Sequence, residues 1–144
     1  FLGYTNDTAA IKYGNFGKLL AFKLDSNEFL AEPTIRDRTI PDQPPLTASA
    51  PELIRGEQLY NVSCGPCHGG NARSGGVIPD LRMMSSTTHT LFNDIVIGGI
   101  YKEKGMASFA DVLNERDTEL VRQFLISRAL IDKAEAEALE AAGG

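Results

Sequence analysis

Apolar residues recur at helical spacing in two stretches of the second half of the chain, and each stretch predicts a helix. The later stretch begins near Asp117, which we expect to be the N-cap, and continues through apolar positions at Leu120, Val121, Phe124, Leu125, Ala129 and Ile131. The earlier stretch runs from Thr88 to Gly98, and its apolar stripe consists of Leu91, Phe92, Ile95 and Val96. Alanine and glutamate predominate in residues 132–142, which predicts that the last helix continues into a solvated, fraying end.

A third helix is predicted over residues 51–60. Pro51 suits the first helical turn, and Glu52 interacts favourably with the positive end of the helix dipole. Gly56 costs about 1 kcal/mol of helix propensity relative to alanine, which suggests that another helix crosses closely there. We expect the last helix to be that partner, with Phe124 packed beside Gly56. The alternative is an ordinary amphipathic helix with an incidental glycine.

A polar stretch between residues 33 and 51 is broken up by prolines at positions 33, 41, 44, 45 and 51. Because proline fixes φ and removes a backbone donor, we expect an extended and partly stiff linker there. The chain is therefore predicted to contain an N-terminal extension (1–32), a linker (33–50), a helical domain (51–131) and an Ala/Glu-rich tail (132–144).

Length and charge narrow the class of protein. The 144 residues allow one compact domain plus an appendage, and an apolar content of 42% can build a core. No apolar run approaches the roughly 20 residues of a membrane span, so we predict a chain that does not span a membrane. The net charge of −5 makes bulk binding of nucleic acid unexpected. The chain begins at Phe1 with neither an initiator methionine nor a signal peptide, which we interpret as a processed or excised piece.

The strongest chemical signal is the run from Cys64 to His68, which reads Cys-Gly-Pro-Cys-His. Two cysteines separated by two residues and followed at once by histidine are typical of a c-type haem attachment site. Each thiol can add to a vinyl group of the porphyrin, and the histidine is then placed to coordinate the iron. We therefore predict one haem c bound through Cys64 and Cys67, with His68 as a ligand of the metal.

Other interpretations of this run are a zinc half-site, a thioredoxin-like redox pair, a structural disulfide and chance. A structural zinc site needs four protein ligands, and the chain has only two cysteines and two histidines, with His68 adjoining Cys67. A thioredoxin-like pair follows a strand, whereas the residues before Cys64 are predicted to be helical. These interpretations are therefore weaker than haem attachment.

Electron-transfer haems usually carry a second axial ligand, and a methionine thioether raises the potential of a histidine-ligated iron. Met106 stands in a loop downstream of the attachment run, between Lys104 and Phe109, and is the predicted ligand. The alternatives are Met83, Met84, or His89 in a bis-histidine site. Without a role in ligation, His89 is expected to cap or decorate a helix.

The segment Ile78-Pro79-Asp80-Leu81 lies between the attachment run and the middle helix. A buried carbonyl there, accepting from the free ring nitrogen of His68, would set the orientation and basicity of the ligand. We therefore include Pro79 among the candidate haem-binding residues, with a simple turn residue as the alternative. Four basic residues form either a rim that steers an acidic partner or scattered solvated charges: Arg73, Arg82, Lys102 and Lys104.

Taken in order, these features resemble a class I cytochrome c over roughly residues 50–131: Gly56, Leu59-Tyr60, Cys64 to His68, Ile78 to Leu81, Gly105-Met106 and the helix of Phe124. The resemblance implies a mainly α fold in which a handful of helices enclose one haem and leave one edge exposed for electron transfer. A short strand-containing extension and the proline-rich linker are expected to precede this fold.

The flanks suggest a narrower resemblance. Residues 17–25 resemble the last propeller strand of quinoprotein alcohol dehydrogenases, and Gly105 to Phe109 with the terminal helix resemble their fused cytochrome domain. In that family a propeller binds pyrroloquinoline quinone and calcium, oxidises an alcohol and passes electrons to a C-terminal haem c domain. The resemblance thus assigns the quinone and calcium to a catalytic domain missing from this chain. A generic amphipathic strand is the alternative for residues 18–25. A strand there without its partner strands would have an unpaired edge, which favours pairing with another segment.

The resemblance implies one-electron transfer from a quinone-dependent dehydrogenase domain to a downstream carrier, either a periplasmic redox protein or a membrane oxidase chain. It also implies a periplasmic location, because c-type haem is attached outside the bacterial cytoplasm. Two alternatives stay open: a free-standing monohaem carrier, and a small-ligand or peroxide-handling haem protein with an open position on the iron.

Overall fold

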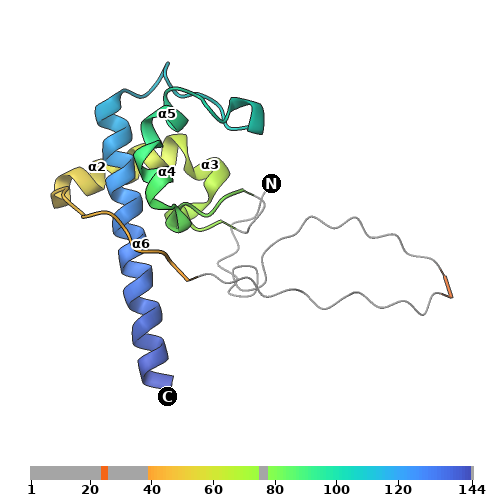
Figure 1. The fold of residues 1–144 in the computed structure, drawn as a ribbon, viewed down its shortest axis with the longest axis vertical. Coiled ribbons are helices and arrows are strands. Elements are labelled where there is room, and N and C mark those ends of the chain that lie inside the picture. Colours follow the sequence, from red (N-terminus) through yellow and green to blue (C-terminus); the bar gives the residue numbers. More distant parts are fainter. Residues whose placement is uncertain (1–23, 26–38, 75–77, 144) are drawn as a thin grey trace.

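The computed structural model describes residues 24–25, 39–74 and 78–143, and its fold is mainly helical (Figure 1). The mainly α fold is therefore confirmed, and the described residues contain no strand. The predicted strand-containing extension lies outside the described residues except for a turn at Leu24 and Asp25. No helix in the described ranges is long and apolar enough to cross a membrane.

Helix α2 spans Ala50–Ser63 and confirms the helix predicted over residues 51–60. It begins at a capping box, because the carboxylate of Glu52 accepts from the backbone N–H of Ser49 at 2.8 Å. The helix ends where Cys64 becomes its C-cap. The first cysteine of the attachment run is thus held at the end of a well-capped helix.

Helix α6, the long last helix, spans Glu115–Gly143. Its predicted start is wrong by a few residues, because Asn114 and not Asp117 provides the cap. The side-chain oxygen of Asn114 accepts from the backbone N–H of Asp117 at 3.0 Å, and the Asp117 carboxylate accepts from the Asn114 N–H at 3.3 Å. Asn114 is therefore the capping residue, and Asp117, in the first turn of the helix, accepts a hydrogen bond from its backbone. The predicted extension of the helix into residues 132–142 is confirmed.

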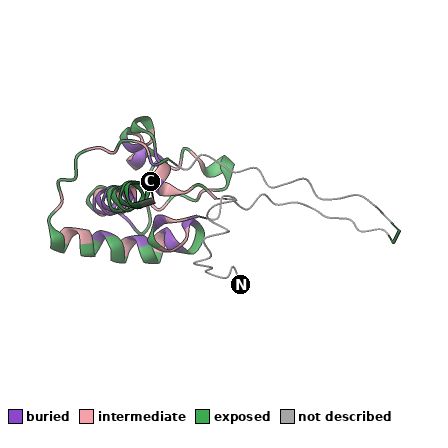
Figure 2. Cartoon of the chain, turned by 90° about the horizontal axis from the view of Figure 1, so that it is seen from below, coloured by how far each residue is buried: buried purple, intermediate pink, exposed green. Residues whose placement is uncertain are grey.

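Helices α2 and α6 cross at Gly56, as predicted from the glycine (Figure 1). A Cβ atom built on Gly56 would lie 2.2 Å from the backbone oxygen of Leu120 and 3.1 Å from the Cβ of Phe124. One turn along α2, the rings of Tyr60 and Phe124 pack with their centroids 5.3 Å apart. Only a residue without a side chain lets the two backbones approach this closely. Gly56 and Tyr60 are the buried residues of α2, and the remainder of this helix is coloured exposed or intermediate in Figure 2.

Short helices form the remainder of the described fold: α3 (Gly65–His68), η1 (Gly70–Ala72), η2 (Leu81–Met83), α4 (Ser86–Thr90), α5 (Phe92–Val96) and η3 (Lys102–Lys104). The single middle helix predicted from Thr88 to Gly98 is wrong, because the chain breaks at Leu91 between α4 and α5. Leu91 has ψ near 6°, outside the helical range. The hydroxyl of Thr90 also donates to the backbone carbonyl of Ser86 within α4 at 3.1 Å, a contact that weakens regular helix.

One apolar core lies between α2, α5, α6 and the connecting loops. Its buried members are Tyr60, Cys64, Ala72, Met84, Phe92, Val96, Leu113, Val121, Phe124 and Leu125. Residues 39–49 form neither helix nor strand and pass along α6, where Gln123 accepts from the backbone N–H groups of Thr47 and Ala48 at 2.9 and 3.3 Å. The core therefore carries the first cysteine of the attachment run, and α6 supports the segment that leads into the domain.

Candidate haem c site

The attachment run forms a single helical turn. The backbone N–H groups of Cys67 and His68 both donate to the carbonyl of Cys64, at 3.1 and 2.9 Å. Residues three and four positions apart lie on the same side of a helix, so both thiols and the imidazole project from one side of this turn. This is the arrangement that two thioether bonds and one iron ligand on a single porphyrin require.

Both thiols are free, so the described structure contains no disulfide between them. Cys64 is buried in the core and Cys67 is exposed. Burial, together with the charge of Cys67, raises the pKa of the Cys64 thiol to about 11. The described residues also gather no group of three histidine, cysteine or carboxylate side chains that could hold a metal ion, so the zinc interpretation lacks further ligands there.

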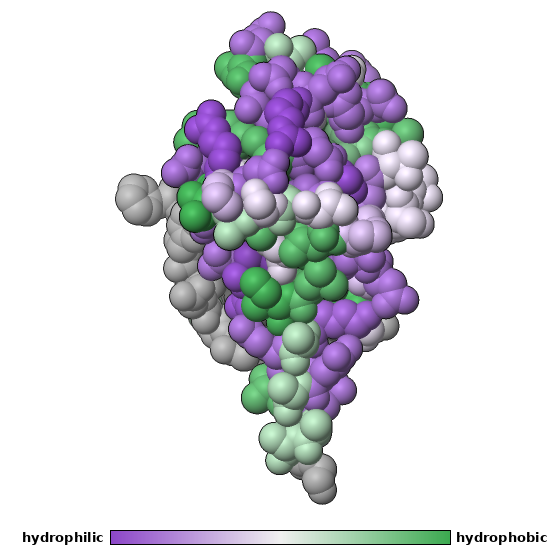
Figure 3. Space-filling view, turned by 90° about the vertical axis from the view of Figure 1, so that its left-hand side faces the viewer, coloured by the Kyte–Doolittle hydropathy of each residue, from purple (hydrophilic) through white to green (hydrophobic). Residues whose placement is uncertain are grey.

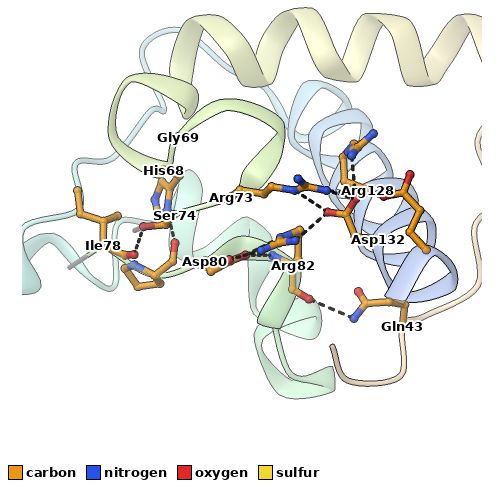
Figure 4. Close-up of polar contacts among 12 residues, drawn as sticks. Gln43, His68, Gly69, Arg73, Ser74, Ile78, Asp80, Arg82, Arg128 and Asp132 are labelled. Carbon is orange, nitrogen blue, oxygen red and sulfur yellow. Dashed lines mark hydrogen bonds and ion pairs between the residues drawn. The ribbon is translucent and has the colours of Figure 1, made fainter. Parts of the chain in front are cut away.

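His68 is buried, with 9% of its surface exposed, and its Nδ1 lies 2.9 Å from the carbonyl oxygen of Pro79 (Figure 4). Because a carbonyl only accepts, Nδ1 is the donor of this hydrogen bond, and Nε2 is the ring nitrogen left for another partner. Nε2 has no hydrogen-bond partner among the described residues. The hydrogen bond predicted from the Ile78–Leu81 segment is therefore present, and it leaves Nε2 as the nitrogen that could bind a metal.

The loop after His68 is shaped by a glycine and a tyrosine. Gly69 has φ of +83°, and a Cβ atom there would lie 2.1 Å from the Arg73 carbonyl. The Tyr60 hydroxyl donates to the Gly69 carbonyl at 2.5 Å, which ties the loop to α2. Farther along, the Ser74 hydroxyl donates to the Ile78 carbonyl next to Pro79. The carbonyl that accepts from His68 thus lies in a segment with hydrogen bonds of its own.

Met106 is half-buried in the loop after η3 and packs against the core cluster that contains Cys64. Its backbone N–H donates to the Tyr101 carbonyl at 3.2 Å. Of the alternative ligands, Met84 is buried within the core and Met83 is half-buried in η2. Ligation of iron by Met106 stays a prediction, and its position against the same cluster as Cys64 is compatible with it.

His89 does not decorate the surface of a helix, which corrects the expectation from the sequence. It is 5% exposed in α4, and its Nε2 lies 3.1 Å from the side-chain oxygen of Gln43. Its Nδ1 is buried and has no hydrogen-bond partner within residues 39–74 and 78–143. Burial and the charge of Arg122 lower the pKa of His89. His89 therefore faces the Gln43 segment and Arg122 on α6, and none of its described hydrogen bonds involves the attachment turn.

The four basic residues do not form one rim. Lys102 and Lys104 are exposed beside the methionine loop, with the Lys104 ammonium 4.5 Å from the centre of the Tyr101 ring. Arg82 is 6% exposed and Arg73 is half-buried, and both donate to a carboxylate of α6. Two of the four basic side chains are thus paired with a carboxylate of α6, and one of these two, Arg82, is buried.

That carboxylate belongs to Asp132, which the sequence placed in the solvated tail. Asp132 is 5% exposed and accepts from three arginines, Arg73, Arg82 and Arg128, at 2.8 to 3.1 Å (Figure 4). We call these four residues the Asp132 cluster. The available signal was helical spacing, because Asp132 follows Leu125 by seven positions and Ala129 by three and so lies on the buried face of α6.

The Asp132 cluster predicts a loss of stability in acid. Burial alone would raise the pKa of Asp132, but hydrogen bonds from Arg73 and Arg82 and the charges of Arg73 and Arg128 lower it below its ordinary value. A lowered pKa contributes stability that is present above the unfolded value of about 4 and is lost as the pH falls through the folded value. Between about pH 6 and pH 3 the thermal midpoint of Asp132→Asn should therefore fall less than that of the unchanged protein.

The matched control is Asp111→Asn, since Asp111 is exposed. Its midpoint should follow that of the unchanged protein at every pH, as measured by far-ultraviolet circular dichroism. A parallel fall for Asp132→Asn and the unchanged protein would show that Asp132 contributes nothing to acid sensitivity.

A mainly helical fold with two free thiols and an imidazole on one turn defines the domain as a c-type cytochrome. Residues 51–125 match the family model described as "Cytochrome C oxidase, cbb3-type, subunit III". This match covers just over half of the 144 residues, and the chain belongs to this family. A cytochrome c domain implies haem c, and the free Cys64 and Cys67 thiols and unpartnered His68 Nε2 fit that group.

The chain is also similar to part of several larger proteins. It is 38% identical over 119 residues to quinohemoprotein alcohol dehydrogenase ADH IIB of Pseudomonas putida, covering 82% of this chain and 17% of that protein. The solved structure of ADHIIG from Pseudomonas putida HK5 superposes with a TM-score of 0.64 at 39% identity, over 74% of this chain and 15% of that one. Cytochrome c550 of Pseudomonas aeruginosa is 33% identical over 76 residues, which is 50% of this chain and 52% of that protein. The chain thus spans about one sixth of the dehydrogenases and is homologous to their cytochrome c domain.

Proposed function

We propose that this domain transfers single electrons through one haem c, which Cys64 and Cys67 would attach and whose iron His68 and Met106 would ligate. The observation that carries the proposal is the turn that presents both free thiols and the buried imidazole on one side. When bound, the haem supplies an iron that alternates between its ferrous and ferric states. The residues of this chain fasten the haem, orient it and enclose it.

Each of these residues has a distinct task in the proposal. The thiols of Cys64 and Cys67 hold the porphyrin in place from the end of α2 and from α3. The hydrogen bond from His68 Nδ1 to Pro79 keeps the ring orientation and directs Nε2 to the iron. Met106 would supply a thioether as the second ligand, a type of ligand that raises the reduction potential.

The proposed electron donor is a quinone-dependent dehydrogenase that carries pyrroloquinoline quinone and calcium in a separate catalytic domain. The similarity to two quinohemoprotein alcohol dehydrogenases, of which this chain spans about one sixth, supports this donor. Exposed apolar side chains, among them Leu130 and Ile131 of α6, favour an interface with another protein or domain. In Figure 3 hydrophobic side chains gather in the middle of one otherwise mostly hydrophilic face.

The proposed acceptor is a periplasmic redox protein or a membrane oxidase chain, and the proposed location is the periplasm, where c-type haem is attached. The similarity to cytochrome c550 favours a second candidate, a free-standing monohaem carrier with the same chemistry and a different donor. A reading frame for a propeller domain joined directly upstream would support the fused form, and its absence would support the carrier.

Optical spectra of the purified protein in both oxidation states test the proposed ligands. A low-spin spectrum with a sulfur-to-iron charge-transfer band in the ferric state would support histidine and methionine ligation. A high-spin spectrum that changes on adding cyanide or imidazole would contradict it and favour small-ligand or peroxide chemistry.

The Met106→Ala variant identifies the second ligand. We expect loss of the charge-transfer band and binding of exogenous imidazole, because removal of the thioether opens a position on the iron. The matched control is Met83→Ala, since Met83 is also half-buried and lies in η2. It should keep the spectrum of the unchanged protein. Retention of the band in Met106→Ala would refute ligation by Met106, and its loss in Met83→Ala would assign the ligand to Met83.

A further inference from the structure

The carboxylate of Asp132 lies at the centre of the Asp132 cluster and uses both of its oxygens. Its Oδ1 accepts from Arg73 Nη2 at 2.8 Å and from Arg128 Nη2 at 2.9 Å, while its Oδ2 accepts from Arg82 Nη1 at 2.8 Å and from Arg73 Nε at 3.1 Å. Three guanidinium groups from three parts of the chain thus converge on one buried carboxylate. Such charge-assisted contacts have strict geometry and hold their partners in one arrangement.

Arg82 links this carboxylate to a second one. It is 6% exposed, and its guanidinium donates from Nη2 to Asp80 Oδ2 at 2.6 Å and from Nε to Asp80 Oδ1 at 3.0 Å. The same Asp80 oxygen accepts the backbone N–H of Arg82 at 3.1 Å. Because the Arg82 fork is planar and engages both carboxylates, the position of Asp80 depends on that of Asp132.

Asp80 directly follows Pro79, whose carbonyl accepts from His68. On the other side of Pro79, the Ile78 carbonyl accepts from the Ser74 hydroxyl, so both neighbours of Pro79 are tied to other parts of the structure (Figure 4). The contacts therefore form a continuous path from α6 to the ring of His68. The path runs through Asp132, Arg82, Asp80 and the Pro79 carbonyl.

We propose that Asp132 acts through Arg82 and Asp80 as a positioning residue for His68, and that it thereby lowers the reduction potential of the bound haem. A well-aligned hydrogen bond at Nδ1 makes the imidazole a stronger donor to iron, which favours the ferric state. Disturbing the path misaligns the Pro79 carbonyl, weakens this bond and raises the potential. The inference rests on the proposed ligation of haem by His68.

The test compares the haem-loaded protein with its Asp132→Asn and Arg82→Lys variants. For Asp132→Asn we expect the ferric–ferrous equilibrium to shift about tenfold toward the ferrous state, which corresponds to about 59 mV for a one-electron couple. In the diamagnetic ferrous state, the proton signal of His68 Nδ1 should move upfield and exchange faster with water. Arg82→Lys keeps the charge and loses the planar fork, so the same two changes in that variant would not come from altered charge.

Glu135→Gln is the matched control for charge. Glu135 lies on α6 one turn beyond Asp132, is largely exposed, and has an oxygen 3.9 Å from Arg73. The Glu135→Gln substitution removes the same charge from nearly the same place without touching the path to Pro79. The His68 Nδ1 signal of this variant should stay unchanged, and its ferric–ferrous equilibrium should shift less than twofold.

The outcomes distinguish the possible roles. If Asp132→Asn and Arg82→Lys lower the melting temperature but leave the potential and the Nδ1 signal unchanged, the Asp132 cluster only fastens the loop to α6 and the proposal is overturned. If Asp132→Asn does not fold, Arg82→Lys decides by the same two measurements. If the unchanged protein shows no histidine signal that is shifted by the haem, the proposed ligation by His68 is refuted instead.

Discussion

Replacement of both Cys64 and Cys67 by serine is expected to leave a chain that carries no covalently bound haem. The two sulfurs are the atoms that would form the thioether bonds, and they are the only cysteines of the chain. A serine hydroxyl keeps the size of the side chain and lacks the nucleophilic thiol. The measurement is haem staining after denaturing electrophoresis, together with extraction of haem into acidified organic solvent.

The single variants Cys64→Ser and Cys67→Ser serve as controls, because each retains one thiol and should retain stainable haem with an altered absorption maximum. His68→Ala provides a further comparison, since it keeps both sulfurs and removes only the proposed iron ligand. Covalent haem in the double variant would contradict attachment at this turn and with it the proposed function.

Gly56→Ala is expected to produce a large loss of stability from a single added methyl group. In an isolated helix this change would stabilise by about 1 kcal/mol. Here the new Cβ would lie 2.2 Å from the Leu120 carbonyl oxygen and 2.8 Å from its carbon, both of which are backbone atoms that no rotamer change can move. Because α2 and α6 must separate, we expect a net loss of about 2 to 3 kcal/mol.

The measurement is the free energy of unfolding from denaturant titration of the haem-loaded protein. Gln58→Ala is a suitable control, since Gln58 is exposed on the same helix, and it should change stability by no more than about 0.5 kcal/mol. A Gly56→Ala variant as stable as the unchanged protein would show that the helices separate at little cost. The close approach at Gly56 would then have no energetic role.

Several features were predictable because they depend on residues near one another in the chain. The attachment run needs only three side chains within five positions, and a single helical turn places them together. The α6 helix follows from apolar spacing that repeats every three to four residues, and α2 follows from Pro51 and Glu52 in its first turn. The unexpected glycine in α2 also predicted the crossing, because an unfavourable helix residue usually has a packing reason.

The ends of the helices were harder to predict, because neighbouring residues differ little in their preference for the capping position. Asn114 and Asp117 are both good capping residues, and which one begins α6 is decided by where the preceding loop delivers the chain. Similarly, the apolar stripe from Leu91 to Val96 does not reveal the break at Leu91. Local spacing therefore identified the elements more reliably than their ends.

The sequence by itself determined the helical class of the fold, and it predicted the covalent chemistry of the attachment run and the contact between α2 and α6. Only the tertiary structure decided the surroundings of that chemistry: the burial of His89, and the pairing of Arg73 and Arg82 with the buried carboxylate of Asp132. Asp132 lies 50 positions after Arg82 in the chain. The pairing of charges so far apart depends on how α6 packs, and a pattern of neighbouring residues carries no information about that packing.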